Sequence, residues 1–316
     1  MTGILLIDKP SGPTSHDVVA RLRQVTRERS IGHAGTLDPR ATGLLVMLLG
    51  KATRLASLLS GHDKVYEATI RLGWATTTDD AAGERLSGIG AAKATPYTMD
   101  EATPYTADEA TCAVSDTALE EALTQFRGTF DQMPPQHSAK KVDGHKAYDM
   151  ARKDQHVPLK TASVTVRSLD LVARTGDLVQ LTMTVTAGFY VRSLARDLGE
   201  RLGCGAHLHA LRRTRSGAFQ VESATSLDDA DRLGPLLEPR LISLADALPD
   251  LPAVRVSEGG LVRVRHGNPI GPQFAEGSWA PMGSSLTKIR LLDESGALIA
   301  LADLRGGQLH PSVVLG

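Results

Sequence analysis

At 316 residues the chain is long enough for one large domain with a smaller one appended, because single hydrophobic cores stop growing near this size. Hydrophobic residues make up 41% and charged residues 22%, a balance that excludes a chain disordered throughout. The formal net charge of −1, taken alone, argues against a polyanionic partner.

The N-terminal part predicts a strand, a helix and a loop. Residues 4–7 are an apolar run that ends in a Pro- and Gly-rich turn, which predicts a strand. Thr14 or Ser15 can cap a helix that continues to about Val25, with its apolar residues on one stripe. Residues 31–43 are rich in Gly, Pro and polar residues, so we expect a loop that presents its side chains instead of packing them.

The next part alternates short elements around one insertion. Residues 44–49 predict a buried strand, 52–59 a short helix and 64–72 a second strand. An eight-residue repeat within residues 94–111 contains prolines and has no apolar face. We therefore expect an exposed insertion at about residues 86–114.

A strand that turns directly into a helix follows further along. Helices are predicted over about 115–126 and 145–153. Residues 178–187 place apolar side chains on one face and polar ones on the other, which is typical of a half-solvated strand. Gly188 turns this strand into a helix over about 191–202, an arrangement that commonly displays side chains.

Beyond Pro239 the sequence predicts a compact β domain. Short β-prone runs separated by Gly or Pro lie at residues 262–264, 288–292 and 297–301. We place the boundary within residues 240–252, which gives a first domain of residues 1–245 and a second of residues 246–316. Strands and helices interspersed without strict βαβ alternation make the larger domain α+β.

Basic residues are concentrated in three segments. Residues 1–60 hold eight Lys/Arg against four acids, residues 136–160 six against three, and residues 190–215 six arginines against two acids. If these segments converge on one face, they form a phosphate-binding surface that the net charge conceals. Solvated helix faces explain the same counts equally well.

Two kinds of targeting segment are not found. The longest apolar runs, such as residues 43–50, are far shorter than the roughly 20 residues that span a bilayer. The N-terminus lacks the basic stretch and cleavage site of a signal peptide. We therefore expect a cytoplasmic location.

The segment from Gly32 to Gly43, GHAGTLDPRATG, holds the strongest candidate for chemistry. Its glycines allow close backbone approach, and Pro39 biases Asp38 toward an extended conformation. The carboxylate of Asp38 is thus held out at the tip of a stiffened loop. An Asx turn before Pro39 explains the same residues without any chemistry, and the segment alone does not choose between the two.

Motifs of other enzyme classes are not found. The chain has no Gly-Lys-Ser/Thr at phosphate-loop spacing, no Gly-x-Gly-x-x-Gly after a strand and no Gly-x-Ser-x-Gly. Ser15 and His16 are neighbours that point in different directions on a helix. Cys204, His207 and His209 match no common zinc spacing and have no evident fourth ligand. We predict neither a metal nor a cofactor.

Five segments in the same order resemble the bacterial tRNA pseudouridine-55 synthase family, the TruB-type pseudouridine synthases. The matching segments are Gly3–Gly12, His33–Gly43, Lys64–Glu67, Gly188–Arg192, and Leu202–Leu208 with Leu211–Arg213. The resemblance is close over residues 1–85 and 115–215 and loose in the tail, and the repeat has no counterpart. It implies a mixed, largely antiparallel sheet with flanking helices, followed by a small β-barrel of the PUA type that contacts RNA.

The resemblance implies catalytic roles for three residues. Asp38 would be the nucleophile, and Arg192 its catalytic partner, since a guanidinium beside a carboxylate favours the ionised acid. Tyr66 would pack against the target base and is a candidate for removing its C5 proton. A lone tyrosine in a strand is otherwise more often half-buried core.

Other positions match residues around that centre. His33 and Tyr190 match substrate-contacting positions, and Leu211 matches an apolar residue that lines the pocket. Lys9, a further candidate for substrate binding, belongs to a motif that packs near the active-site loop, more as scaffold than as chemistry. Asp80 aligns with a further acid, which we interpret as structural or RNA-adjacent.

The implied reaction is isomerisation of the uridine at position 55 in the T-loop of tRNA. The base flips out of its stack, the glycosidic bond is cut with assistance from Asp38, and the uracil rotates and rejoins through C5. No cofactor is needed, because reactant and product are isomers. The expected partner is the T-arm of tRNA, with no membrane and no protein partner, for a monomer.

Three alternatives stay open on the sequence alone. A non-catalytic RNA-binding or tRNA-folding protein could keep the fold while Asp38 does no chemistry. A synthase could act on another RNA stem-loop. A hydrolase could use the Gly-rich loop, and would release phosphate from nucleotides.

Overall fold

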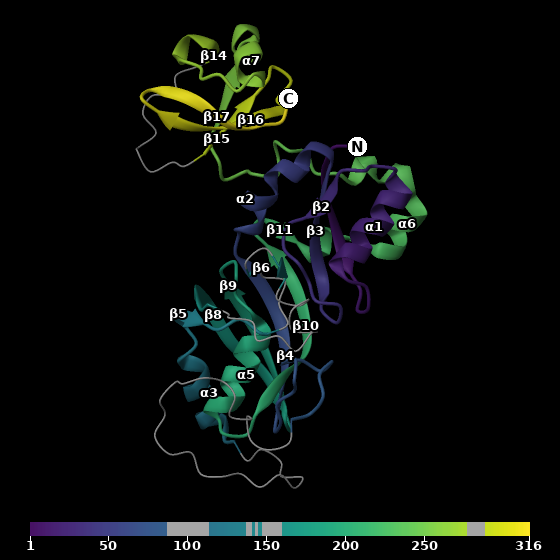
Figure 1. Cartoon of the computed structure of the whole chain (residues 1–316), viewed down its shortest axis with the longest axis vertical. Coiled ribbons are helices and arrows are strands. Elements are labelled where there is room, and N and C mark those ends of the chain that lie inside the picture. Colours follow the sequence, from purple (N-terminus) through teal and green to yellow (C-terminus); the bar gives the residue numbers. More distant parts are fainter. Residues whose placement is uncertain (87–113, 137–140, 143–144, 147–159, 277–287) are drawn as a thin grey trace.

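The computed structural model contains a ten-stranded sheet, a five-stranded sheet and a two-stranded ribbon (Figure 1). It describes residues 1–86, 114–136, 141–142, 145–146, 160–276 and 288–316. The large sheet has the order β12-β1-β3-β10-β4-β9-β8-β5, with β11 paired to β10 and β2 to β3. Its strands are β1 (Gly3–Lys9), β2 (Ile31–His33), β3 (Thr42–Leu49), β4 (Lys64–Leu72), β5 (Gly128–Gln132), β8 (Ala162–Thr175), β9 (Leu178–Val185), β10 (Ala206–Ser216), β11 (Phe219–Gln220) and β12 (Thr225–Ser226).

Helices flank the sheet and link it to the C-terminal part (Figure 1). The α-helices are α1 (Ser15–Thr26), α2 (Ala56–Ser60), α3 (Asp116–Thr124), α5 (Val191–Arg201), α6 (Leu227–Leu233) and α7 (Glu258–Arg265). The 3-10 helices are η1 (Gly50–Leu55), η2 (Val221–Ser223), η3 (Gly234–Arg240) and η4 (Pro272–Phe274). Thr14 caps α1 through a capping box with Asp17, so the predicted helix is confirmed and Ser15 is left to bond elsewhere.

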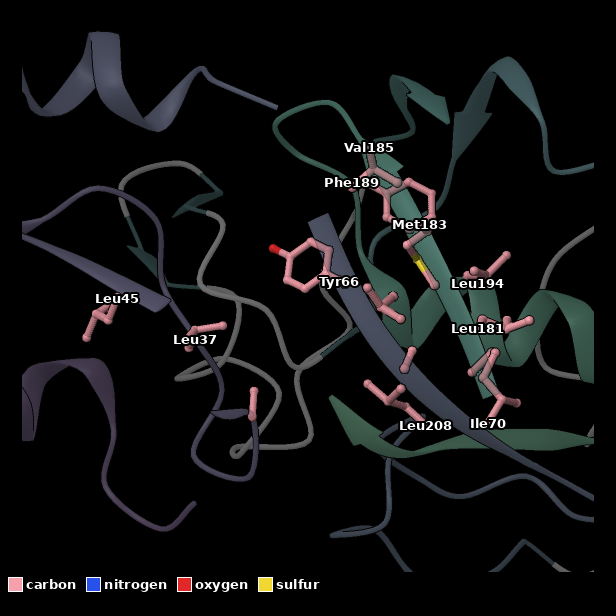
Figure 2. Packing of buried hydrophobic residues seen from close by; sticks show 14 of the residues in the cluster. Leu37, Leu45, Tyr66, Ile70, Leu181, Met183, Val185, Phe189, Leu194 and Leu208 are labelled. Atoms are coloured by element: carbon pink, nitrogen blue, oxygen red, sulfur yellow. The ribbon is translucent and has the colours of Figure 1, made fainter. Parts of the chain in front are cut away.

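The two faces of the large sheet belong to different cores. Apolar residues of β9, from Val179 to Val185, alternate with polar ones and face the core under α1 and α5, as the half-solvated pattern predicted. Figure 2 shows part of this core around Met183 and Phe189. In β1 and β3 both faces are buried, because a second core on the opposite face includes η1, the linker and Leu301 of the C-terminal sheet.

The large sheet is nearly divided between β3 and β10. These parallel strands share only two register pairs, Arg212 with Thr42 and Arg213 with Gly43. Gly43 has φ +94°, and a Cβ there would lie 2.3 Å from the Arg213 carbonyl oxygen, so only glycine fits. The start of β3, and with it the loop that precedes β3, therefore lies beside β10, at the border of the half made of β10, β4, β9, β8 and β5.

The C-terminal residues form their own sheet in the order β14-β13-β15-β16-β17. Its strands are β13 (Ala253–Val256), β14 (Ala275–Glu276), β15 (Ile289–Leu292), β16 (Leu298–Arg305) and β17 (Gln308–Val314). Within the part of the chain that the structure describes, this path is open and does not close into the expected barrel. Residues 262–264 lie in α7 and not in a strand, because they bury one side, at Val264, against the sheet.

Three local expectations need correction. The expected loop over 31–43 begins later, because Ile31–His33 pairs with β3 as β2. The expected helix over 52–59 is a 3-10 turn followed by the short α2. The expected helix from residue 145 begins instead with β7 (His145–Lys146), which pairs with β6 (Lys141–Val142); residues 147–153 lie outside the described part.

Most of the repeat-containing insertion, residues 87–113, also lies outside the described part. Among the described residues, no helix is long and apolar enough to cross a membrane. The α+β class is confirmed by the mixed sheet and its flanking helices.

Candidate active site

Asp38 lies in residues 34–41 between β2 and β3, here called the Asp38 loop. The buried hydroxyl of Ser15 accepts a hydrogen bond from the Leu37 amide at 2.9 Å and donates one to the Leu37 carbonyl at 3.0 Å. Leu37 also packs into the core. Because one side chain satisfies both backbone groups of Leu37, the direction of the next residue, Asp38, is fixed.

Lys9 supports the loop from inside the protein. It is fully buried, and its ammonium donates to the carbonyls of Pro10, Pro13 and Pro39 at 2.9, 2.9 and 3.0 Å. Burial lowers the pKa of Lys9 to about 8, while the charge of Asp38 opposes that shift. This corrects the expectation of a substrate contact, because all three bonds go to the backbone of the surrounding turns.

Arg213, on β10, also supports the Asp38 loop from inside the protein. Its side chain is 1% exposed and donates to the carbonyls of Gly35, Thr36 and Leu44. A guanidinium has five N–H donors in a fixed plane, so it can hold several carbonyls at set distances. The base of the Asp38 loop is thereby tied to the strand across the division in the sheet.

Asp38 and Arg192 are brought into direct contact, although they are 154 residues apart in the sequence. Arg192 Nε lies 3.0 Å from Asp38 Oδ2, and Arg192 Nη2 lies 3.3 Å from Asp38 Oδ1. This side-on, two-point pairing is the strong geometry for a guanidinium and a carboxylate. Arg192 is therefore no surface arginine, since its side chain is 7% exposed.

The carboxylate is accessible and electrostatically perturbed at the same time. The side chain of Asp38 is 41% exposed, so a ligand can reach it. Loss of hydration raises the pKa of Asp38 above its ordinary value, Arg192 opposes the rise, and the neighbouring charge of Asp80 adds to it. The guanidinium is thus what favours the ionised acid in this environment.

Arg192 has further acceptors in the turn that follows β4. Its Nη1 donates to the Thr78 carbonyl at 3.4 Å, and its Nε lies 4.0 Å from Asp80 Oδ2. The other carboxylate oxygen of Asp80 accepts from the Thr78 hydroxyl and the Ala82 amide. Asp80 is therefore a neighbour of the arginine, which fits its interpretation as structural.

Gln132 fixes the N-terminus of α5, the helix whose first turn contains Arg192. Its side-chain amide accepts from the Tyr190 backbone N–H at 2.8 Å and donates to the Tyr190 carbonyl at 3.0 Å. Gln132 is 2% exposed, so this contact is buried. Tyr190, an expected substrate contact, is thereby held as the residue that precedes α5.

Tyr66 and Leu211 both border the core under α5. Tyr66 is 9% exposed, and Figure 2 shows its ring projecting from β4 on the side of Leu37, with Met183 and Phe189 behind it. Leu211 of β10 is partly buried against the same core. Both residues thus border the same core, and their contact with a substrate stays a prediction.

His33 lies at the end of β2, one residue before the Asp38 loop. Its ring meets that of His16 edge-on at 5.8 Å, and burial lowers its pKa, with the charges of His16 and Arg213 adding to the effect. Among the described residues its Nδ1 is buried without a hydrogen-bond partner. The neutral form of His33 is thus favoured, and its contact with a substrate stays a prediction.

A hollow of about 630 Å³ lies on the polar face of the large sheet. It is lined by Ser11, Arg40, Thr42, Glu67, Ala68, Thr69, Val172, Gln180, Leu181, Thr182, His209, Ala210, Leu211 and Arg212. Neither Asp38, Tyr66 nor Arg192 borders it. Arg40 of the Asp38 loop and Leu211 do border it, so the hollow reaches the Asp38 loop without reaching the paired Asp38 and Arg192.

Within the described ranges, no group of three or more His, Cys, Asp or Glu side chains is arranged to hold a metal ion. The chemistry available around Asp38 is that of a carboxylate, a guanidinium and a phenol. These groups can attack or assist at an electrophilic carbon and move a proton.

Sequence reasoning missed several residues that shape the site. Gln132 lies in no matching segment, and Arg213 was matched only as part of Leu211–Arg213, without a role; both act through backbone groups of distant segments. Ser15 was considered only as a helix cap or a hydrolase residue. No local pattern indicates its bond to Leu37, 22 residues away.

Comparisons with known proteins agree with this geometry. The model of the TruB family pseudouridylate synthase N-terminal domain matches residues 23–104 and 87–191, and that of the tRNA pseudouridylate synthase B C-terminal domain matches residues 192–233. A chain from an H/ACA ribonucleoprotein bound to a substrate RNA containing 2′-deoxyuridine shares the fold, with a TM-score of 0.69 at 23% identity, over 100% of this chain and 85% of that one. The class defined by fold and family models is that of the pseudouridine synthases.

Curated relatives identify the family within this class. A tRNA pseudouridine synthase B from Thermobifida fusca is 43% identical, covering 99% of this chain and 98% of its own. Those from Leifsonia xyli and Solibacter usitatus are 41% and 37% identical, covering 99% and 100% of this chain and 96% and 100% of their own. The chain belongs to the tRNA pseudouridine synthase B family and is an enzyme that isomerises uridine in tRNA.

Proposed function

We propose that this enzyme converts the uridine at position 55 in the T-loop of tRNA to pseudouridine, with Asp38 as its nucleophile. The observation that carries the proposal is the pairing of Asp38 with the buried Arg192 at 3.0 Å. An anionic oxygen is thereby held at the tip of a pinned loop and remains open to a ligand. These are the requirements for attack on an anomeric carbon, which must be approached from one side.

The target base must leave its stack before it can react. Flipping costs a few kcal/mol, and contacts from basic residues to the surrounding phosphates offset it. The carboxylate of Asp38 then attacks C1′ or assists loss of the base by abstracting a sugar proton; both routes cut the C1′–N1 bond. The freed uracil rotates and rejoins through C5, whose proton is finally removed.

Tyr66 is the proposed base for that proton and the surface on which the uracil rotates. Its ring projects from β4 on the side of Leu37, while Met183 and Phe189 lie across the strand in the same core (Figure 2). Leu211 excludes water from the same space, while His33 and Tyr190 contact neighbouring nucleotides. Reactant and product are isomers, so no redox or group carrier takes part.

The C-terminal residues 246–316 are proposed to be a PUA-like RNA-binding domain. The five-stranded sheet packs on the catalytic part through Leu298, Leu301 and Leu315, which would hold an RNA-binding surface at a set distance. The enzyme is proposed to act as a monomer in the cytoplasm.

The test uses the purified chain, unmodified tRNA transcripts and chemical detection of pseudouridine. Asp38→Asn should bind tRNA with wild-type affinity and form no pseudouridine, because the amide keeps the shape and loses the nucleophile. Asp116→Asn is the matched control: its side chain is 82% exposed and pairs with Arg174 at 2.7 Å on the surface. Full activity of Asp38→Asn would refute the role of Asp38.

Substrate choice is tested in the same assay. An isolated T-arm stem-loop should be modified at the T-loop uridine, and an anticodon stem-loop should not. Mapping of pseudouridine in total RNA from cells lacking the protein should show loss at position 55. Loss at a different stem-loop would redirect the proposal to that RNA.

A further inference from the structure

The turn that supplies acceptors to Arg192 contains a strained residue. Asp79 has φ +60°, and Arg27 is the only other non-glycine residue with positive φ among those the structure describes. This left-handed conformation costs about 1 kcal/mol for a residue with a side chain, although Asp tolerates it better than most. Thr78 and Asp80, on either side of Asp79, are the two residues of this turn that face Arg192. The strained Asp79 thus lies at the bend that directs both Thr78 and Asp80 toward Arg192.

The carboxylate of Asp79 is turned toward α5. Its Oδ2 lies 3.3 Å from Arg196 Nη1, and the two side chains are only 16% and 18% exposed. Arg196 is one helical turn beyond Arg192, so both arginines project from the same face of α5 toward this turn. Burial raises the pKa of Asp79 to about 6, and the charge of Arg196 opposes that rise, so Asp79 is ionised at pH 7 and can pair with the guanidinium.

Arg196 is itself held firmly. Its Nη2 donates to the Met133 carbonyl at 3.1 Å, and its Nε donates to Asp197 Oδ1 at 2.9 Å. Ser193 of α5 donates to the same Met133 carbonyl at 2.7 Å. The guanidinium of Arg196 is therefore a fixed point on α5 against which a partner can be placed.

We propose that the Asp79–Arg196 ion pair is a positioning device for catalysis. By anchoring the strained turn to α5, it keeps the Thr78 carbonyl and the Asp80 carboxylate against Arg192, and Arg192 in turn keeps its orientation toward Asp38. The inference rests on the proposed roles of Asp38 and Arg192. Neither Asp79 nor Arg196 touches the substrate; both act through Arg192.

Backbone bonds alone do not fix this turn against the helix. The Asp79 carbonyl accepts from the Leu208 amide at 3.0 Å, and the Leu208 carbonyl accepts from the Ala81 amide at 2.9 Å. These bonds tie the turn to β10 and not to α5. Apart from the contacts of Arg192 itself, the Asp79–Arg196 pair is the side-chain contact that joins this turn to α5 among the described residues.

The test compares variants that remove the charge or keep it. Asp79→Asn retains the side-chain shape and tolerates the left-handed backbone, yet loses the ion pair. It should lower the single-turnover rate of pseudouridine formation about tenfold, because small misplacements of catalytic groups are costly. The dissociation constant for tRNA should stay within about twofold of wild type, since the pair faces α5.

A second pair of variants separates positioning from folding. Arg196→Met should lose rate like Asp79→Asn, Arg196→Lys should recover part of it, and the double variant Asp79→Asn/Arg196→Met should be no slower than either single one. Asp177→Asn is the control, because it breaks another partly exposed ion pair, with Arg71 at 2.8 Å, away from α5; its rate should be that of wild type.

Outcomes distinguish this inference from the proposed function. A wild-type rate for Asp79→Asn while Asp38→Asn is inactive overturns the positioning pair and leaves the nucleophile intact. A fully active Asp38→Asn overturns the nucleophile whatever Asp79→Asn does. Equal losses of rate, tRNA binding and thermal stability in Asp79→Asn, or additive losses in the double variant, also overturn the inference.

Discussion

The hydroxyl of Ser15 offers a sharp test of how the Asp38 loop is held. Ser15 is 1% exposed and makes both bonds to the backbone of Leu37, at 2.9 and 3.0 Å. In Ser15→Ala both bonds are lost and a buried amide and carbonyl are left without partners. Each bond contributes about 1 kcal/mol and each unsatisfied buried group costs about 1–3 kcal/mol. We therefore expect the free energy of unfolding to fall by about 2–4 kcal/mol.

The same change should affect catalysis, because Leu37 directly precedes Asp38. Release of its backbone lets the carboxylate sample directions away from Arg192, and we expect the single-turnover rate to fall about tenfold. Urea unfolding and a rate measurement on tRNA transcripts give the two numbers. Ser57→Ala, at an exposed position in α2, is the control and should leave both unchanged. A Ser15→Ala variant with wild-type stability and rate would refute the idea that this hydroxyl fixes the loop.

Two further predictions concern Gly43 and His207. Gly43→Ala should cost about 3 kcal/mol or more in urea unfolding, because its Cβ would meet the Arg213 backbone at 2.3 Å, whereas Gly12→Ala, with similar positive φ but open space, should pay only about 1 kcal/mol of strain. Equal costs would show that the close approach does not matter. Burial lowers the pKa of His207 in the folded protein below its value of about 6.5 in the unfolded chain. The unfolded chain therefore takes up the proton first, and the protein loses stability as pH falls below about 6.5. His207→Gln should therefore gain stability relative to wild type between pH 7 and pH 5 in urea titrations, and a constant difference would contradict this.

The sequence alone predicted many of the local elements and pointed to Asp38 as the candidate for the reacting residue. Helix α1 follows from an apolar stripe behind a Thr14 capping box, and β9 follows from strict alternation, because both signals lie within one element. The stiff Gly- and Pro-rich loop marked Asp38, and its resemblance to a known family pointed to Arg192. The prediction of secondary structure was wrong at residues 145–146 and 262–264, because pairing and packing with other segments overrule short-range preference there.

Only the tertiary structure decided how that loop is held. Lys9 and Arg213 hold the loop from inside because backbone carbonyls from separate segments converge on their side chains. Gln132 bonds to the backbone of Tyr190 because β5 ends beside the start of α5. The Asp79–Arg196 pair depends in the same way on a turn and a helix 117 residues apart. These contacts join residues whose spacing in the chain carries no periodic signal, since burial and hydrogen-bond satisfaction are properties of the folded core.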